Sequence, residues 1–377
     1  MSEARVTNLS NESNSGGPTI SGITTFSGTN YFVPPVGDTA SRPENPEKGS
    51  IRFNTDSKYL EYYRGDTIGW VEVEASNEEL NGGNRGLIMG GIISGRANNV
   101  DYVTISTCGN AAEFGDLVAT ASQGAGLASR TRGIAGGGTP STPSGTNNID
   151  FCTIASKGNF ADFGDFDTTG FEKTACASQT RGVFFGASVA PNQGNTIEYI
   201  TIAATGNSVD FGDMRGTCAE ASVAGSSTRG VTIGGRYTSP AYENTMDYVT
   251  IATTGNSQDF GDITGGKAGN TRGGNCGSAT RGVFLTNTTG TDAQNTIEYV
   301  TIATLGNSVD FGDRTVARTQ VAQFSSTVRG VFAGAGEGNT DVIDYVQIAT
   351  TGNATDFGNL QSNYGYAVGC SNGHGGL

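Results

Sequence analysis

Residues that carry chemistry are scarce in this sequence. It holds a single histidine, His374, and none of its six cysteines lies in a C-x-x-C pair, so neither a zinc site nor a dithiol redox centre is expected. It also lacks a G-x-S-x-G nucleophile motif and the lysine of a phosphate-binding P-loop. Lys and Arg number 22 against 36 acidic residues, and the net charge of −14 argues against nucleic acid, which needs a basic face. We therefore expect no catalytic residues, no metal and no cofactor.

Long apolar runs and helix-forming stretches are missing too. No run approaches the roughly 20 apolar residues of a membrane span, and residues 1–7 lack the apolar centre of a signal peptide, so we expect neither a membrane partner nor standard secretion. With 59 glycines and little Leu or Lys, long helices are disfavoured. Thr, Ile, Val, Tyr and Phe recur in register between Gly and Asn clusters, which indicates many short strands joined by turns rather than a disordered chain.

A unit of about 50 residues recurs along the chain and has two anchors. The first is Phe-Gly-Asp, whose last copy ends in Asn359; the second is Arg-Gly followed by an apolar run. Copies of D-F-G without a lysine strand or H-R-D loop exclude a protein kinase. The FGD aspartates are Asp116, Asp165, Asp213, Asp262 and Asp313. The Arg-Gly arginines are Arg85, Arg132, Arg181, Arg229, Arg281 and Arg329.

Each unit carries four short strands, which matches a propeller blade better than a solenoid rung. Each unit begins with an Arg-Gly strand, which is followed by a variable loop and an alternating strand such as Ile197–Ile202. A Gly-Asn turn, the FGD segment and a fourth apolar run then complete the unit. The first unit begins abruptly at Arg85, whereas a spare strand around Tyr366–Ser371 lies after the last unit. We expect this strand to complete the first blade. The predicted fold is all-β, with a closed six-bladed β-propeller at 84–377 after a small N-terminal β module.

The glycine pattern resembles kelch-type and galactose-oxidase-like propellers. Their blades of about 50 residues carry a double glycine after a strand, as at Gly90-Gly91, Gly136-Gly137 and Gly234-Gly235. The later kelch tryptophan is absent, so the resemblance implies a shared architecture rather than membership of the family.

One Arg and one Asp at constant separation in each unit suggest a repeated Arg–carboxylate bridge. We predict that Arg181 and Arg229, and their equivalents, contact acidic side chains of the FGD or Asp/Glu-Tyr positions. The alternative is one calcium ion per blade, because carboxylates and carbonyls in a turn suit a hard cation. The bridge or a turn cap is favoured, with each FGD phenylalanine in the core between sheets.

The few remaining chemical groups have structural explanations. Cys176, Cys276 and Cys370 share one repeat position that holds Leu127, Ala224 or Phe324 in other units, which is the behaviour of a small apolar core residue. We expect the cysteines to be free and buried. His374 lies by the proposed closing strand, and we interpret it as structural rather than catalytic.

The N-terminal quarter differs from the repeats. We predict an N-terminal arm at 1–35, polar in its first 15 residues, and a small β-meander at 36–83, whose strands are separated by turns at Thr55–Ser57 and Arg64–Asp66. Arg64-Gly65-Asp66 is interpreted as a hairpin turn and not as an integrin ligand. Three short strands are too few to be stable alone, so the module should pack on another part of this chain or on another chain.

Residues 35–73 resemble a short β module of structural proteins of tailed bacteriophages. The shared residues are R-P-x-x-P, G-S-I-R-F-N-T-D-S, L-E-Y-Y and G-W-V-E-V. The repeats, with T-R-G-V-F and N-T-I-E-Y-V-T-I-A-T, also look like proteins of cyanophages. The resemblance implies a virion component in several copies, from a tail, fibre, baseplate or head appendage, whose module attaches to other virion proteins.

The repeat lengths differ by only five residues, which leaves no room for an inserted catalytic loop. The variable loops after the Arg-Gly strands are the expected binding surface, and Tyr237 and Tyr242 are candidates to contact a host cell-surface glycan or protein. The predicted function is therefore a non-enzymatic phage virion protein for host attachment or particle decoration. A purely architectural virion subunit and a lectin-like or glycan-processing bacterial propeller remain the alternatives.

Overall fold

The computed structural model describes residues 33–57, 60–73, 85–140, 145–189, 192–236, 242–264, 274–286, 294–336, 338 and 340–377. The chain divides into two compact units, Met1–Ser76 and Asn77–Leu377. Every regular element in the described ranges is a β-strand, as the composition predicts. No helix in these ranges is long and apolar enough to cross a membrane.

The first unit contains one four-stranded sheet in the order β1-β2-β3-β4. Its strands are β1 (Val36–Gly37), β2 (Ile51–Asn54), β3 (Leu60–Tyr63) and β4 (Trp70–Val73). The strands β2, β3 and β4 form the predicted antiparallel meander. Sequence analysis missed β1, a two-residue strand that pairs with β2 in parallel.

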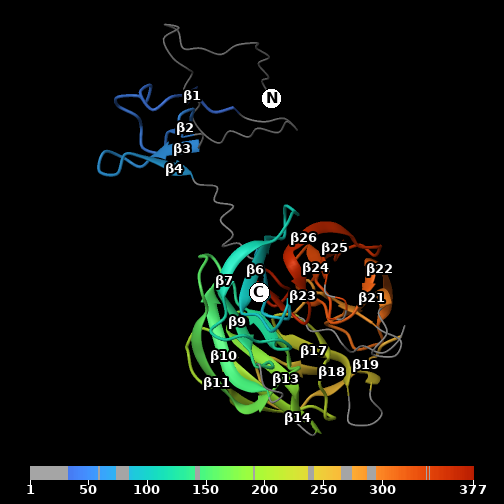
Figure 1. The fold of residues 1–377 in the computed structure, drawn as a ribbon. Coiled ribbons are helices and arrows are strands. Elements are labelled where there is room, and N and C mark those ends of the chain that lie inside the picture. The colour runs from blue at the N-terminus through green and yellow to red at the C-terminus, as the bar shows by residue number, and fades with distance from the viewer. Residues whose placement is uncertain are drawn as a thin grey trace, which may run out of the picture. The chain divides into compact units, whose positions relative to one another are not determined.

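The second unit contains six antiparallel sheets in its described part (Figure 1). Sheet 1 joins β27 (Val368–Ser371), β5 (Arg85–Met89), β6 (Asn99–Thr104) and β7 (Ala112–Asp116). Sheet 2 joins β8 (Ala125–Ala128), β9 (Arg132–Gly136), β10 (Thr146–Thr153) and β11 (Ala161–Gly170), and sheet 3 joins β12 (Thr174–Ala177), β13 (Arg181–Val189), β14 (Asn192–Thr201) and β15 (Val209–Asp213). Sheet 4 joins β16 (Ser222–Gly225), β17 (Arg229–Arg236), β18 (Tyr242–Thr250) and β19 (Gln258–Asp262).

The last two sheets complete the set. Sheet 5 joins β20 (Arg281–Leu285), β21 (Gln294–Thr301) and β22 (Val309–Arg318), and sheet 6 joins β23 (Ala322–Ser325), β24 (Arg329–Ala333), β25 (Thr340–Gln347) and β26 (Thr355–Tyr364). In sheet 5 the place of the first strand is taken by the segment around Cys276, whose carbonyl accepts the N–H of Val283 at 3.0 Å. Repeated four-stranded antiparallel sheets place the unit in the β-propeller-like class.

The strand β27 pairs with β5 although nearly 300 residues separate them. Cys370 lies opposite Leu87, so the predicted pairing of the C-terminal strand with the first Arg-Gly strand is confirmed. The first strands of neighbouring sheets contact one another, β27 with β8, β8 with β12, and β23 with β27. Figure 1 shows the C-terminal end of the chain in the middle of these sheets.

The hydrophobic core lies between neighbouring sheets. One cluster joins Phe211 and Val183 of sheet 3 to Val249 of sheet 4, and Phe211 is 2% exposed. Phe211 also meets Tyr199 edge to face, with ring centroids 6.0 Å apart. The prediction that the FGD phenylalanine belongs to the core between sheets is thus confirmed.

Candidate functional site

The FGD segment lies on the last strand of its sheet and binds a turn of the next sheet. In sheet 3, Phe211 O accepts the N–H of Gly255, and Asp213 O accepts the N–H of Ser257, at 2.7 and 2.8 Å. The N–H of Asp213 donates in turn to Asn256 Oδ1 at 3.0 Å. The Gly-Asn turn, which the sequence predicts as a hairpin turn, therefore also forms hydrogen bonds with the FGD strand of the preceding sheet.

The same docking recurs in the other five sheets. The FGD segments of sheets 1, 2, 4, 5 and 6 bind turns of the following sheet, and sheet 6 binds sheet 1. Their phenylalanine carbonyls accept the N–H groups of Gly158, Gly206, Gly306, Gly352 and Gly109, respectively. The asparagines that accept from the third residue of each segment are Asn159, Asn207, Asn307, Asn353 and Asn110.

The glycine of this motif is required by close approach. A Cβ on Gly212, at φ +144°, would lie 2.6 Å from the carbonyl carbon and oxygen of Gly255. Gly255 itself has φ +153°, but a Cβ there would meet nothing within 4 Å. A side chain at Gly255 would therefore strain the main chain only, whereas a side chain at Gly212 would also collide with the neighbouring sheet.

We expect Gly212→Ala to lower the free energy of unfolding by about 2–4 kcal/mol, because overpacking against the backbone adds to the strain of a positive φ. The matched control Gly255→Ala should cost only about 1 kcal/mol, since it carries the strain without the collision. Urea unfolding followed by circular dichroism measures both. Equal losses would show that the close approach of the two sheets does not matter.

The repeat arginines bind main-chain carbonyls of the next sheet. Arg181 donates through Nη1 to Ile251 O and Ala252 O, both at 2.9 Å. Its guanidinium also lies 4.4 Å from the ring centroid of Tyr199 in its own sheet, a cation–π geometry. The carbonyl partners of Arg85, Arg132, Arg229, Arg281 and Arg329 are those of Ile154, Ile202, Ile302, Ile348 and Ile105.

These contacts correct the prediction that Arg181 and Arg229 contact acidic side chains of the FGD or Asp/Glu-Tyr positions, because both arginines donate to main-chain carbonyls. Arg181 lies opposite Thr201 of β14, whereas Asp213 lies opposite Thr196 on its other side. Five residues of extended strand separate the two groups by about 16 Å, so no bridge between them forms. The FGD aspartates Asp116, Asp165, Asp213, Asp262 and Asp313 instead lie exposed or half-buried on the last strand of each sheet.

The ion pairs form at another acid, the Asp or Glu before the aromatic residue of each second long strand. Glu198 accepts from Lys173 Nζ at 2.6 Å, and both side chains are almost fully buried. The equivalent Asp247 and Asp344 bind Arg215 and Arg318, at 2.7 and 2.5 Å. Sequence analysis noted this acid only as an arginine partner, although its recurrence between apolar residues signals a buried charge.

Within the described residues, Asp101 and Asp150 have no basic partner. Burial raises the pKa of Asp101 to about 6, although the hydroxyl of Tyr364 donates to it. The pKa of Asp150 is likewise raised to about 6, chiefly by burial and to a smaller extent by the nearby carboxylate of Asp162. One carboxylate oxygen of Asp150, Oδ2, accepts the N–H of Val118 at 3.2 Å. The other, Oδ1, is buried and has no hydrogen-bond partner.

His374 is 2% exposed and forms hydrogen bonds to Ala128 of β8 and to Asn275, which lies next to Cys276 of sheet 5. Its Nε2 lies 2.8 Å from Ala128 O and must carry the proton, so Nδ1 accepts from Gly376 N–H and Asn275 Nδ2. Burial lowers its pKa to about 4. This neutral, fully bonded histidine anchors the chain end, as the structural interpretation predicts.

The cysteines form no disulfide among the described residues. Cys152, Cys176, Cys218, Cys276 and Cys370 are buried, whereas Cys108 is half-exposed, so the prediction of free, buried cysteines holds for five of them. Burial raises the pKa of the Cys176 and Cys276 thiols to about 12, which makes them inert. In the same ranges no group of three or more His, Cys, Asp or Glu is placed to hold a metal ion.

The predicted binding loops are described only in part. Tyr237 lies outside the described residues. Tyr242 is the first residue of β18 and lies opposite Arg236 of β17. Arg236 binds Glu172 at 2.6 Å and Glu220 at 3.2 Å.

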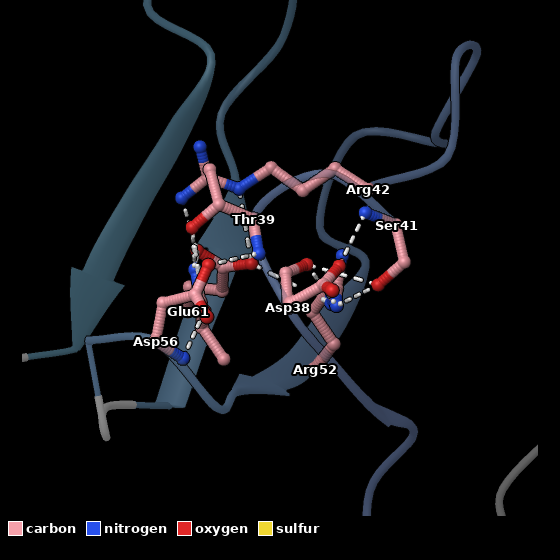
Figure 2. Close-up of polar contacts among 8 residues, drawn as sticks. Asp38, Thr39, Ser41, Arg42, Arg52, Asp56 and Glu61 are labelled. Atoms are coloured by element: carbon pink, nitrogen blue, oxygen red, sulfur yellow. Dashed lines mark hydrogen bonds and ion pairs between the residues drawn. The ribbon is translucent and has the colours of Figure 1, made fainter.

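The shared residues of the N-terminal module converge on one buried carboxylate (Figure 2). Glu61, from L-E-Y-Y, is fully buried and accepts from Arg42 Nη2 at 2.5 Å and Asn54 Nδ2 at 3.2 Å. Arg52 Nε lies 3.5 Å from the same carboxylate, and its Nη2 donates to Asp38 O. The hydrogen bond from Arg42 lowers the pKa of Glu61 despite burial. The shared residues therefore form a network of ion pairs and hydrogen bonds that stabilises the fold of the module.

The opposite face of this sheet is apolar and incompletely covered. The pairs Ile51–Tyr62 and Tyr62–Val71 place these side chains on the face that Glu61 does not share. Ile51 is 51% exposed, and Val36 at the sheet edge is 59% exposed. The sheet thus buries Arg52, Asn54 and Glu61 on one face while it leaves apolar side chains of the other face exposed or half-buried, which is typical of a surface that contacts another protein.

No protein-family model matches this chain, and no curated protein is significantly similar to it. The function is therefore argued from the geometry of the two units.

Proposed function

We propose that this chain is a non-enzymatic structural protein of a tailed-phage particle, with the N-terminal module as its attachment and the second unit displayed. The observation that carries the proposal is the incompletely covered apolar face of the module, where Ile51 is 51% exposed and Tyr62 and Val71 are half-buried. A small sheet with its charges inside and its apolar side chains outside needs a partner surface. The resemblance of residues 35–73 to virion modules supplies the class of that partner.

We further propose that the second unit is a closed, kelch-like propeller of six blades. Support comes from the docking of each FGD segment on the next sheet, which returns from sheet 6 to Gly109 of sheet 1, and from the pairing of β27 with β5. Near-identical sheets held by main-chain hydrogen bonds make a rigid scaffold, and its variable loops suit recognition of a host surface or decoration of the particle.

Antibody fragments against residues 33–73 and against the second unit test the proposal on purified particles of the phage that encodes this chain. We expect the protein in intact particles, the second unit labelled in electron micrographs, and the module labelled only after the particle is disrupted. Binding of the isolated full chain to host cells would favour attachment over decoration. Particles that contain none of the protein would rule out a virion role.

A further inference from the structure

A cavity of about 50 Å³ lies where sheets 1 and 2 meet. Its wall includes the apolar side chains of Met89, Leu117 and Val368, and the polar side chains of Ser122 and Asp150. One water needs roughly 10–15 Å³ of such space, so the cavity has room for a group of several heavy atoms.

Two buried polar atoms of this wall lack a hydrogen-bond partner. Asp150 is 8% exposed and Ser122 is 2% exposed. Asp150 Oδ1 and Ser122 Oγ are both unpartnered. A buried oxygen without a partner costs free energy, and a charged one costs more. An acceptor and a hydroxyl in one cavity indicate a ligand that donates hydrogen bonds.

The other sheet junctions indicate the charge of that ligand. At the positions equivalent to Asp150, Glu198 binds the ammonium of Lys173, and Asp344 binds the guanidinium of Arg318. Both cations come from the segment that follows the preceding FGD motif. Asp247 binds Arg215 from the corresponding segment, so the fold offers this acid a cation at three comparable junctions.

At the Asp150 junction the chain supplies no such side chain. Ala121 lies five residues after Asp116, as Arg318 lies five after Asp313 and Tyr364 five after Asn359. The equivalence is structural too, because the carbonyl of Ala121 accepts the N–H of Gly91 as that of Tyr364 accepts the N–H of Ala335. A methyl group therefore stands where Arg318 and Tyr364 fill the space at two of the other junctions.

We propose that this cavity binds the ammonium group of a short primary alkylamine, free or at the end of a longer amine. The ammonium donates to Asp150 Oδ1 and Ser122 Oγ, and the first carbons of its chain lie against Met89, Leu117 and Val368. At pH 7.5 the Asp150 carboxylate is ionised, since its pKa is raised only to about 6. The bound cation then offsets the cost of burying that charge.

Ethylammonium chloride is the probe, titrated into the full chain at pH 7.5 and constant ionic strength and followed by saturation-transfer NMR. We expect saturable binding, and none of ethanol, which is similar in size but uncharged. Asp150→Asn should weaken binding about tenfold or more, because hydrogen bonds between charged groups are the strong ones. Asp101→Asn is the matched control and should bind as the wild type does, since Tyr364 already occupies that junction.

A second variant keeps the test decisive if Asp150→Asn does not fold. Ala121→Arg supplies the cation from within the chain, as Arg318 does, and should abolish ethylammonium binding while raising the melting temperature. A signal in the wild type that never saturates would overturn the proposal. So would equal binding by wild type and either of the two cavity variants.

Discussion

Removal of Val368–Leu377 is expected to abolish cooperative folding of the second unit. Every residue from Val368 to Gly376 is buried, and β27 covers the edge of β5 through four residue pairs. The segment also carries His374, and its Gly375 N–H donates to Gly277 O at 3.0 Å. The loss approaches the roughly 5–15 kcal/mol that stabilises a whole domain.

Far-ultraviolet circular dichroism with urea titration measures this effect. Deletion of Leu377 alone is the control and should change stability little, because this residue is only half-buried. A synthetic peptide of residues 366–377 added to the shortened chain should restore a cooperative transition. A shortened chain with the stability of the full chain would show that β27 and the following residues are dispensable.

Replacement of Glu61 by Gln is expected to unfold the N-terminal module at pH 7. The change leaves Arg42 and Arg52 beside a neutral amide, and breaking a buried ion pair costs about 3–5 kcal/mol. One four-stranded sheet has little stability to lose. Trp70 is the only tryptophan of the chain and contacts Tyr63 at 5.5 Å between ring centroids, so its fluorescence reports on this module alone.

The same carboxylate makes module stability depend on pH. The folded state lowers the pKa of Glu61 below its usual 4.5, chiefly through the hydrogen bond from Arg42. Its contribution is therefore complete above about pH 4.5 and is lost as the pH falls through the lowered pKa. Acid titration of Trp70 fluorescence should show this loss in the wild type.

Glu44→Gln makes the same chemical change at an exposed position and serves as the control. It should leave both the emission maximum at pH 7 and the acid midpoint of the wild type unchanged. A Glu61→Gln chain with native Trp70 emission at pH 7 would contradict the central role of this carboxylate.

The candidate sites show where sequence reasoning succeeded and where it did not. The FGD phenylalanine was correctly placed between sheets, because an aromatic residue recurring among polar ones has few other places to lie. The predicted acidic partner of the repeat Arg was wrong, because Arg181 and Arg229 bind main-chain carbonyls. Charge complementarity suggested Asp213 for Arg181, whereas the geometry of β14 keeps the two about 16 Å apart and offers the carbonyl of Ile251.

The sequence of the repeat that contains Asp150 does not by itself predict the cavity there. Ile149-Asp150-Phe151 has the same pattern as the other five copies, and Ala121 is an ordinary small residue. Only comparison across junctions shows that a side chain is missing there. The exposed face of the module was equally hidden, since alternation along β3 does not say which of the two faces is covered.

By itself the sequence determined the all-β class, the period of the repeat, the four strands of most repeats and the pairing of the last strand with the first. The class, the period and the strands follow from local alternation and turn residues, which depend on neighbours along the chain, and the pairing follows from a strand missing in the first repeat and a spare one after the last. Tertiary structure alone decided which atoms the repeated charges bind, which glycines touch the next sheet, and where a buried carboxylate has no partner. Those outcomes depend on distances between sheets of a few ångströms, which residue spacing does not encode.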